Sequence, residues 1–183
     1  MAYRNGTYIA FHAEGNTDPT ASDIKYFNMM KAWHHNDDIE FRFSDSHQKT
    51  YSVRDTSTRD TLLARLRERL NESKNMVLII GNRTRFDTDN VPYEITYAID
   101  TCGLPIICTY PNQGAILSTD HLRGLWPEAL RARIDNGTAR TLHIPFNRDL
   151  IDRGIRQFNL SNMPGWPITI YLAEVYRQCG YNV

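Results

Sequence analysis

The densest group of side chains capable of chemistry lies between Asn82 and Glu94, in the sequence NRTRFDTDNVPYE. The pattern places Glu94 in the first turn of a helix over Pro92–Cys102, one residue before an apolar stripe that begins at Ile95. A carboxylate near the positive end of a helix is electrostatically favoured, and here it would lie close to a cleft at the end of the preceding strand. The spacing leaves two interpretations of Glu94 open: a catalytic carboxylate, or a charge that only compensates the helix dipole.

Two arginines in the same stretch, Arg83 and Arg85, are candidates for binding a diphosphate. Guanidinium groups match phosphate oxygens in shape and charge. The other interpretation is that both are solvated loop charges. Between Arg54 and Arg85 there are eight basic residues against four acidic ones, and this surplus favours a small diphosphate ligand at the rim of a cleft.

Several familiar site patterns do not occur in the sequence. It has no GxSxG elbow, no Walker A loop and no GxGxxG turn. His34 and His35 are adjacent, whereas a helical zinc pair needs i, i+4 spacing, and the three cysteines form no CxxC pair. We therefore expect no metal site and no disulfide framework. A receiver domain is also excluded, because Gly81-Asn82 stands where its acceptor aspartate would be.

Composition excludes further classes. The 183 residues carry 21 basic and 21 acidic side chains, so the formal net charge is zero, which argues against a dedicated nucleic-acid binder. Hydrophobic residues make up 41 %, which is too many for a disordered chain. No signal peptide and no membrane-spanning run are visible, so we expect a cytoplasmic protein without a membrane or nucleic-acid partner.

Five short runs predict strands. The first is apolar at consecutive positions, which is typical of a strand buried on both faces, and the second alternates, as an edge strand does. The predicted strands are Thr7–His12, Glu40–Ser44, Met76–Ile80, Ile106–Tyr110 and Thr141–Pro145.

Helical patterns separate these runs. Leu62, Leu66 and Leu70 recur every four residues, so we expect an amphipathic helix with these leucines in the core. The other predicted helices are Ala21–His35, Pro92–Cys102, a segment near Leu117–Ile134 and a segment after Phe146.

Regular alternation of strands and helices predicts an α/β fold. Five parallel strands with helices on both faces fit the flavodoxin-like order 2-1-3-4-5. We expect this domain to occupy residues 1–147, and residues 148–183 to form a C-terminal helical extension packed on it.

In such a sheet a ligand binds beyond the carboxyl ends of the strands, between the first and third. Topology brings three segments to this place: the end of the first strand, the segment after the second strand and the segment from Gly81 into the next helix. Phe11, Phe86 and Tyr93 would supply an aromatic platform, although each suits the core equally well. The predicted substrate-binding residues are Phe11, His12, Ser44, Asp45, Asn82, Arg83, Phe86 and Tyr93.

The order of these short motifs carries a family likeness. The first strand ends in Ala10-Phe11-His12, and the third runs into Ile79-Ile80-Gly81, with Thr84 in the loop after it. Val91-x-Tyr93-Glu94-Ile95 then opens the following helix. Over roughly residues 5 to 110, the chain resembles the TIR-like domains of the ThsB type from bacterial Thoeris anti-phage systems.

This resemblance implies a flavodoxin-like TIR fold in which Glu94 matches the catalytic glutamate. It implies cleavage of the nicotinamide–ribose bond of NAD⁺, which would be a substrate rather than a cofactor. The implied product is a cyclic ADP-ribose isomer that activates a downstream NAD-consuming effector. The likeness also implies a phage-derived trigger and a homo-oligomer.

Two other functions fit the same sequence. One is a non-catalytic TIR-like interaction module, which would turn over no substrate under any trigger. The other is an enzyme resembling nucleoside deoxyribosyltransferases, which share a parallel sheet and glutamate-based N-glycosidic chemistry. It would exchange bases on free nucleosides and ignore NAD⁺.

Overall fold

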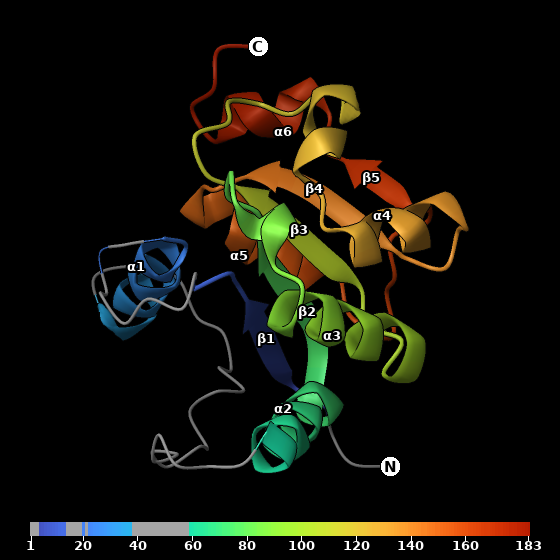
Figure 1. Ribbon diagram of the computed structural model, residues 1–183. Coiled ribbons are helices and arrows are strands. Elements are labelled where there is room, and N and C mark those ends of the chain that lie inside the picture. The colour runs from blue at the N-terminus through green and yellow to red at the C-terminus, as the bar shows by residue number, and fades with distance from the viewer. Residues whose placement is uncertain (1–3, 14–19, 21, 38–58) are drawn as a thin grey trace.

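The protein is built on a five-stranded sheet in which every pair of neighbouring strands is parallel (Figure 1). The computed structural model describes residues 4–13, 20, 22–37 and 59–183. The strand order among them is β1-β2-β3-β4-β5. The strands are β1 (Gly6–Ala10), β2 (Ser73–Ile79), β3 (Ile106–Tyr110), β4 (Thr141–Pro145) and β5 (Ile168–Ile170).

The predicted α/β class with a five-stranded parallel sheet is confirmed. The four strands β1 to β4 correspond to the first, third, fourth and fifth predicted strands. They lie side by side in the sheet in the order predicted for those four. The predicted strand Glu40–Ser44 lies outside the described residues, so the order 2-1-3-4-5 is not what the described sheet shows. The fifth described strand is instead β5, which the sequence did not predict.

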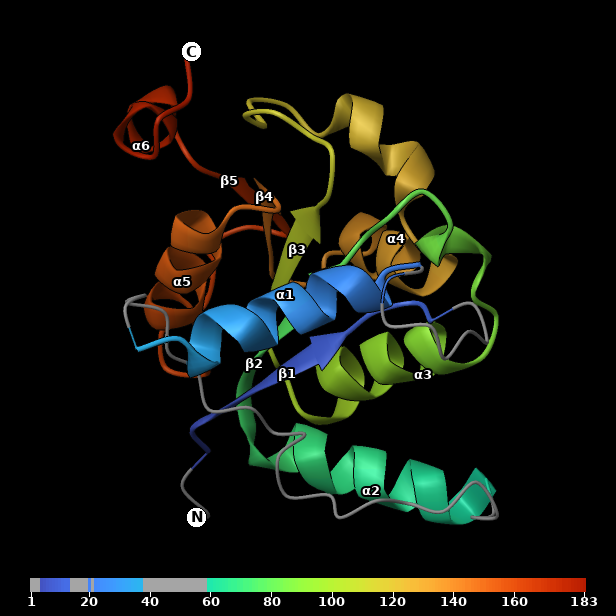
Figure 2. The same ribbon diagram turned by 90° about the vertical axis from the view of Figure 1, so that its left-hand side faces the viewer.

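Helices cover the sheet, with α5 on one face and α3 and α4 on the other (Figure 2). α3 continues directly into a π-helical turn, η2, so the predicted helix over Pro92–Cys102 is present with an earlier start. The helices are α1 (Ile24–His35), α2 (Arg59–Glu72), η1 (Thr84–Phe86), α3 (Asn90–Thr96), η2 (Tyr97–Thr101), η3 (Asp120–Leu125), α4 (Glu128–Asp135), α5 (Arg148–Gln157) and α6 (Ala173–Gln178).

The segment near Leu117–Ile134, for which one helix was predicted, is helical but divided in two. A short 3₁₀ helix, η3, and the helix α4 occupy this segment, with Trp126 and Pro127 between them. Proline has no backbone N–H and disfavours helical geometry in the residue before it, so Trp126 is extended and a new helix starts after Pro127.

The segment after residue 147 contains the predicted helices α5 and α6, but also a strand. β5 pairs with β4 from Thr141↔Ile168 to His143↔Ile170. The prediction of a purely helical tail is therefore corrected: Ile168–Ile170 extends the sheet by one strand.

The core lies on both faces of the sheet, and β2, β3 and β4 are buried almost throughout. Asn75 is a fully buried polar residue in β2, and its amide is saturated. It accepts a hydrogen bond from Thr7 and donates to the backbone carbonyls of Ile155 and Phe158, so it joins β1, β2 and the end of α5. None of the helices in the described part of the chain is long and apolar enough to cross a bilayer.

Candidate active site

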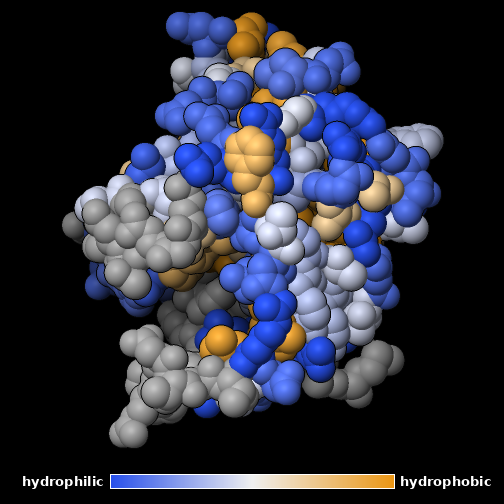
Figure 3. All heavy atoms as spheres, in the orientation of Figure 1, coloured by the Kyte–Doolittle hydropathy of each residue, from blue (hydrophilic) through white to orange (hydrophobic). Residues whose placement is uncertain are grey.

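A cavity of about 600 Å³ opens beside β1, between α1, α2 and the start of α3. Its size suits a small-molecule ligand. In the space-filling view the surface on this side is mostly hydrophilic, but hydrophobic atoms are visible in the hollow between α1 and α2 (Figure 3). The lining residues are Tyr8, Ile9, Phe11, His12, Ala13, Phe27, Leu62, Arg65, Leu66, Arg69, Phe86, Asp87, Thr88, Asp89, Asn90 and Glu94.

Asp87 fixes the start of α3, the helix that carries Glu94. Its Oδ1 accepts hydrogen bonds from the backbone N–H groups of Asp89 (2.8 Å) and Asn90 (3.0 Å), so the helix begins at Asn90. Glu94 therefore lies in the second turn and not, as predicted, in the first. Because the helix dipole acts mainly within the first turn, dipole compensation does not account for Glu94.

The carboxyl group of Glu94 is enclosed, although the residue as a whole is partly exposed. Its Oε1 accepts a hydrogen bond of 2.7 Å from the hydroxyl of Tyr8, which is 2 % exposed. Its Oε2 is buried and has no hydrogen-bond partner among the described residues. A buried carboxylate oxygen without a donor is costly, so this atom is suited to a group that enters the cavity.

Two carboxyl groups in this cavity have pKa values displaced in opposite directions. Burial raises the pKa of Glu94 to about 8; the Tyr8 hydrogen bond lowers it and the charge of Asp87 raises it. For Asp87, burial acts upward, but the N–H of Asp89 and the side chain of His12 outweigh it and hold the pKa below its ordinary value. Such divergence within one cleft is characteristic of sites that perform acid–base or charge-stabilising chemistry.

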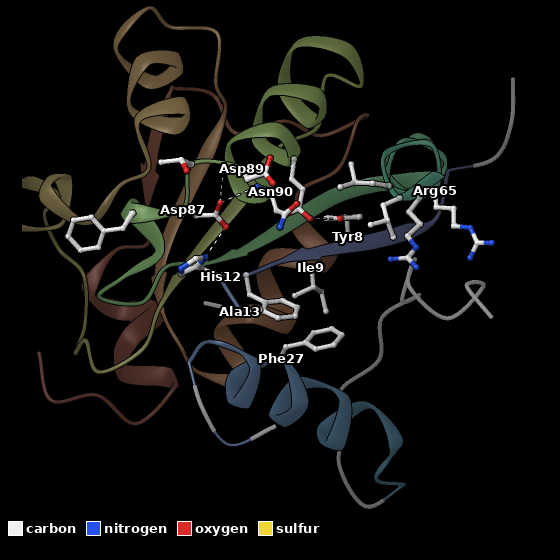
Figure 4. A pocket seen from close by; sticks show the side chains of 16 residues that line it. Tyr8, Ile9, His12, Ala13, Phe27, Arg65, Asp87, Asp89 and Asn90 are labelled. Carbon is white, nitrogen blue, oxygen red and sulfur yellow. Dashed lines mark hydrogen bonds and ion pairs between the residues drawn. The ribbon is translucent and has the colours of Figure 1, made fainter. Parts of the chain in front are cut away.

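His12 and Asp87 both line the cavity and interact with each other (Figure 4). The distance from its Nδ1 to Oδ2 of Asp87 is 2.8 Å. The two side chains are 18 % and 7 % exposed. This pair joins the end of β1 to the start of α3, on the same cavity as Glu94.

Aromatic rings form the wall opposite α3. Phe11 stacks on Phe27 of α1, with ring centroids 4.8 Å apart and an angle of 18° between the planes. Phe86 is 60 % exposed at the rim, and the guanidinium of Arg85 lies 4.7 Å from its ring centre. Phe11 and Phe27 thus pack against the core and face the cavity at the same time.

α2 supplies the positive side of the cavity. Arg65 and Arg69 line it one helical turn apart, beside Leu62 and Leu66. The prediction that the whole leucine stripe is core is wrong for Leu62, which is 48 % exposed, whereas Leu70 is fully buried. The N-terminal part of α2 therefore lies outside the core, and Leu62 there lines the cavity.

A family model described as the TIR-like domain of the Thoeris protein ThsB matches residues 8–115, more than half of the chain. The chain belongs to this family. The matched segment contains every residue that lines the cavity, including Glu94. The sequence resemblance is thereby confirmed, and with it the assignment to a TIR-like family of Thoeris anti-phage defence.

Four of the nine site residues predicted for this ThsB-type domain line the cavity: Phe11, His12, Phe86 and Glu94. Asn82 and Arg83 instead line a smaller hollow of about 160 Å³ beside Asp23. Tyr93 lies on the α2 side of α3, where its hydroxyl accepts a hydrogen bond of 2.5 Å from Arg67 Nε. The last two predicted residues, Ser44 and Asp45, lie outside the described residues.

Tyr8, Arg65, Arg69 and Asp87 line the cavity but are not among the predicted site residues, although Asp87 lies in the segment expected at the cleft. Two of them carried a readable signal. Tyr8 stands in a strand expected to be buried on both faces, and a buried tyrosine hydroxyl requires a partner. Asp87 precedes a helix start by three residues, where an aspartate commonly binds free backbone N–H groups. For the arginines of α2 the sequence showed only the basic surplus between Arg54 and Arg85, which does not say which side chains face the cavity.

Proposed function

We propose that this ThsB-type domain binds NAD⁺ in the cavity and cleaves its nicotinamide–ribose bond, with Glu94 as the catalytic carboxylate. The product would be a cyclic ADP-ribose isomer that acts as a second messenger in Thoeris defence. The observation that carries the proposal is the enclosed Glu94 carboxyl, with one oxygen on Tyr8 and the other without a partner among the described residues.

A single carboxylate suffices for this reaction. In NAD⁺ the leaving group is a pyridinium that departs as neutral nicotinamide, so no acid has to protonate it, unlike the leaving oxygen of an ordinary glycoside. What remains is to stabilise the positive charge that develops on the ribosyl carbon. A carboxylate shielded from water does this more effectively than one in solvent.

The raised pKa of Glu94 fits this role. Burial holds its pKa at about 8, so at neutral pH most molecules carry the proton. A bound nicotinamide cation brings positive charge next to the carboxyl and favours its ionised form. The positive charge of the bound nicotinamide and the negative charge of Glu94 thus stabilise one another, in a buried site that disfavours either charge alone.

The remaining walls match other parts of a dinucleotide. Arg65 and Arg69 bring positive charge to the α2 side, where a diphosphate would lie. The stacked pair Phe11–Phe27 and the exposed ring of Phe86 offer flat surfaces for an aromatic ring of the substrate. Cyclisation additionally requires that bulk water be kept from the ribosyl carbon while an internal nucleophile folds back.

Within this proposal the protein acts in the cytoplasm, responds to a phage-derived trigger and assembles as a homo-oligomer. Its product reaches a separate NAD-consuming effector. NAD⁺ is the substrate, and the reaction uses no cofactor.

The test is incubation of the full chain with NAD⁺, followed by chromatography for nicotinamide and mass comparison of the product with cyclic ADP-ribose standards. The same measurement on phage-infected cells expressing the protein supplies the trigger. Glu94→Gln should abolish nicotinamide release, while Glu174→Gln, an exposed glutamate of α6, should leave it unchanged.

Three outcomes would contradict the proposal. Unchanged release from Glu94→Gln would overturn the site. Absence of NAD⁺ consumption both in the purified protein and in infected cells would favour the interaction module. Base exchange on free nucleosides without any effect on NAD⁺ would favour an enzyme resembling nucleoside deoxyribosyltransferases.

A further inference from the structure

The pair His12–Asp87 is a second titratable unit in the cavity, and cleavage of the nicotinamide bond does not need it. The imidazole and the carboxylate are 2.8 Å apart, and both side chains are largely buried. The other charged residues on the same cavity are Glu94, Asp89, Arg65 and Arg69. Among these carboxyl groups of the described residues, only that of Asp87 forms a hydrogen bond with the imidazole.

The surroundings of Asp87 determine which nitrogen of His12 carries the proton. Oδ1 of Asp87 accepts two backbone N–H groups, which leaves Oδ2 for the imidazole. The same interactions hold the pKa of Asp87 below its ordinary value, so the carboxylate is ionised and can only accept. Nδ1 of neutral His12 therefore donates to Asp87, and the lone pair is on Nε2. Nε2 forms no hydrogen bond with any described residue.

We propose that Nε2 of His12 is the general base for the nucleophile that replaces nicotinamide, and that this nucleophile is an oxygen, either a hydroxyl of the substrate or water. The inference rests on the proposed function and deepens it by naming the chemical class of the acceptor.

The bond between the ribosyl carbon and the nicotinamide nitrogen breaks, and its electron pair stays on nicotinamide. A lone pair of the attacking oxygen forms the new bond to that carbon, and the oxygen's proton moves to Nε2. His12 becomes an imidazolium stabilised by Asp87 and then releases the proton to solvent.

The chemistry of the acceptor explains why a base is needed. A hydroxyl that attacks carbon becomes a strongly acidic oxonium unless its proton is removed during the step. A pyridine nitrogen attacks through a free lone pair and has no proton to lose. The two kinds of nucleophile therefore respond differently to loss of the base, while both need Glu94 to stabilise the ribosyl cation.

This difference is the test. The full chain is incubated with NAD⁺ and either methanol or 3-acetylpyridine, under conditions in which the wild-type protein releases nicotinamide. In His12→Ala we expect transfer to methanol, to water and into cyclic product to fall about 100-fold, the range of a lost general base. Exchange with 3-acetylpyridine should stay within about threefold of the wild-type rate.

Asp87→Asn is the second variant, because its side-chain oxygen still accepts the N–H groups that start α3. Its amide would donate to Nδ1 and leave the proton on Nε2, which removes the base without removing the imidazole. It should therefore reproduce the selective loss seen in His12→Ala. His121→Ala, an exposed histidine of η3, is the matched control and should change neither reaction.

Equal losses of both reactions in His12→Ala and Asp87→Asn would overturn the proposal and assign the pair to substrate binding. Unchanged transfer to oxygen would overturn it as well. These results differ from failure of the proposed function, in which the wild-type protein would show neither release nor exchange and the base would have no reaction to serve.

Discussion

The hydroxyl of Tyr8 in β1 donates a 2.7 Å hydrogen bond to Oε1 of Glu94 in α3, across 86 positions of the chain. Each group satisfies a need of the other. A buried phenol requires an acceptor, and an enclosed carboxyl requires a donor if it is to ionise. The contact therefore links β1 to the charge state of the central carboxyl of the cavity.

Removal of this hydroxyl should impair Glu94 without displacing it. In Tyr8→Phe the pKa of Glu94 should rise further, because the hydrogen bond from Tyr8 lowers it in the wild-type protein. Loss of a hydrogen bond to a charged group costs about 1.5 kcal/mol, or roughly a tenfold loss of nicotinamide release at neutral pH. The pH profile of nicotinamide release is the measurement, and its midpoint should move to higher pH. A uniform loss at all pH values would show that Tyr8 acts only through packing.

Glu94 should make folding stability fall as the pH rises from about 6.5 to 8. Its pKa is about 8 in the folded protein and 4.5 ordinarily, so in this window the folded state holds a proton that the unfolded state has lost. Stability from this group is complete below pH 4.5 and is lost as the pH rises through 8. The slope should be about 1.4 kcal/mol per pH unit at most. Urea titrations of wild-type protein and Glu94→Gln measure it, and the variant should lack this slope.

His143 acts in the opposite sense at lower pH. Burial lowers its pKa from 6.5 to about 3, so the unfolded chain takes up a proton below pH 6.5 that the folded protein does not accept. Its hydrogen bonds agree with a neutral ring. Thr141 donates to the carbonyl of Pro167, so its oxygen accepts from Nε2 of His143, and Nδ1 faces the hydroxyl of Tyr110 at 2.6 Å. Stability from His143 is complete above pH 6.5 and is lost as the pH falls towards 3.

Between about pH 5 and 6.5 the contributions of Glu94 and His143 should therefore nearly cancel. Glu94→Gln should expose the histidine slope, with stability falling on acidification, and His143→Phe should expose the opposite slope. His121→Ala serves as the control and should keep the wild-type profile. A His143→Phe protein with the wild-type profile would contradict the assignment of a buried, neutral imidazole.

A side chain at Gly81 should destabilise the fold. A Cβ at this position would lie 2.1 Å from Oδ1 of Asp23, which is 8 % exposed and accepts a 2.8 Å hydrogen bond from Thr84. Asp23 would have to move and break that bond, so Gly81→Ala should cost about 1–3 kcal/mol of unfolding free energy. Gly124→Ala is the control, since no atom lies within 4 Å of a Cβ there. Equal urea midpoints for the two variants would contradict the prediction.

The sequence alone determined features that depend on local pattern. β3 and β4 have the predicted bounds, and the helix with the leucine repeat is present as α2. Glu94 was singled out from its place before an apolar stripe, and it lines the cavity. Periodicity and helix-start signals act over a few residues, so they can be read from the chain without knowledge of its neighbours.

Tertiary structure decided what depends on distant partners. Ile168–Ile170 is a strand because it pairs with β4, which no local pattern indicates in three residues. Leu62 faces the cavity, and not the core, because of where α2 crosses the rest of the fold.

The contacts that govern the chemistry of the site also depend on the tertiary structure. The hydrogen bond Tyr8–Glu94 joins residues 86 positions apart, and the hydrogen bond His12–Asp87 joins residues 75 positions apart. Such contacts depend on strand register and on the rotation of each helix about its axis. Both are set by packing over the whole core, and a single sequence records neither of them.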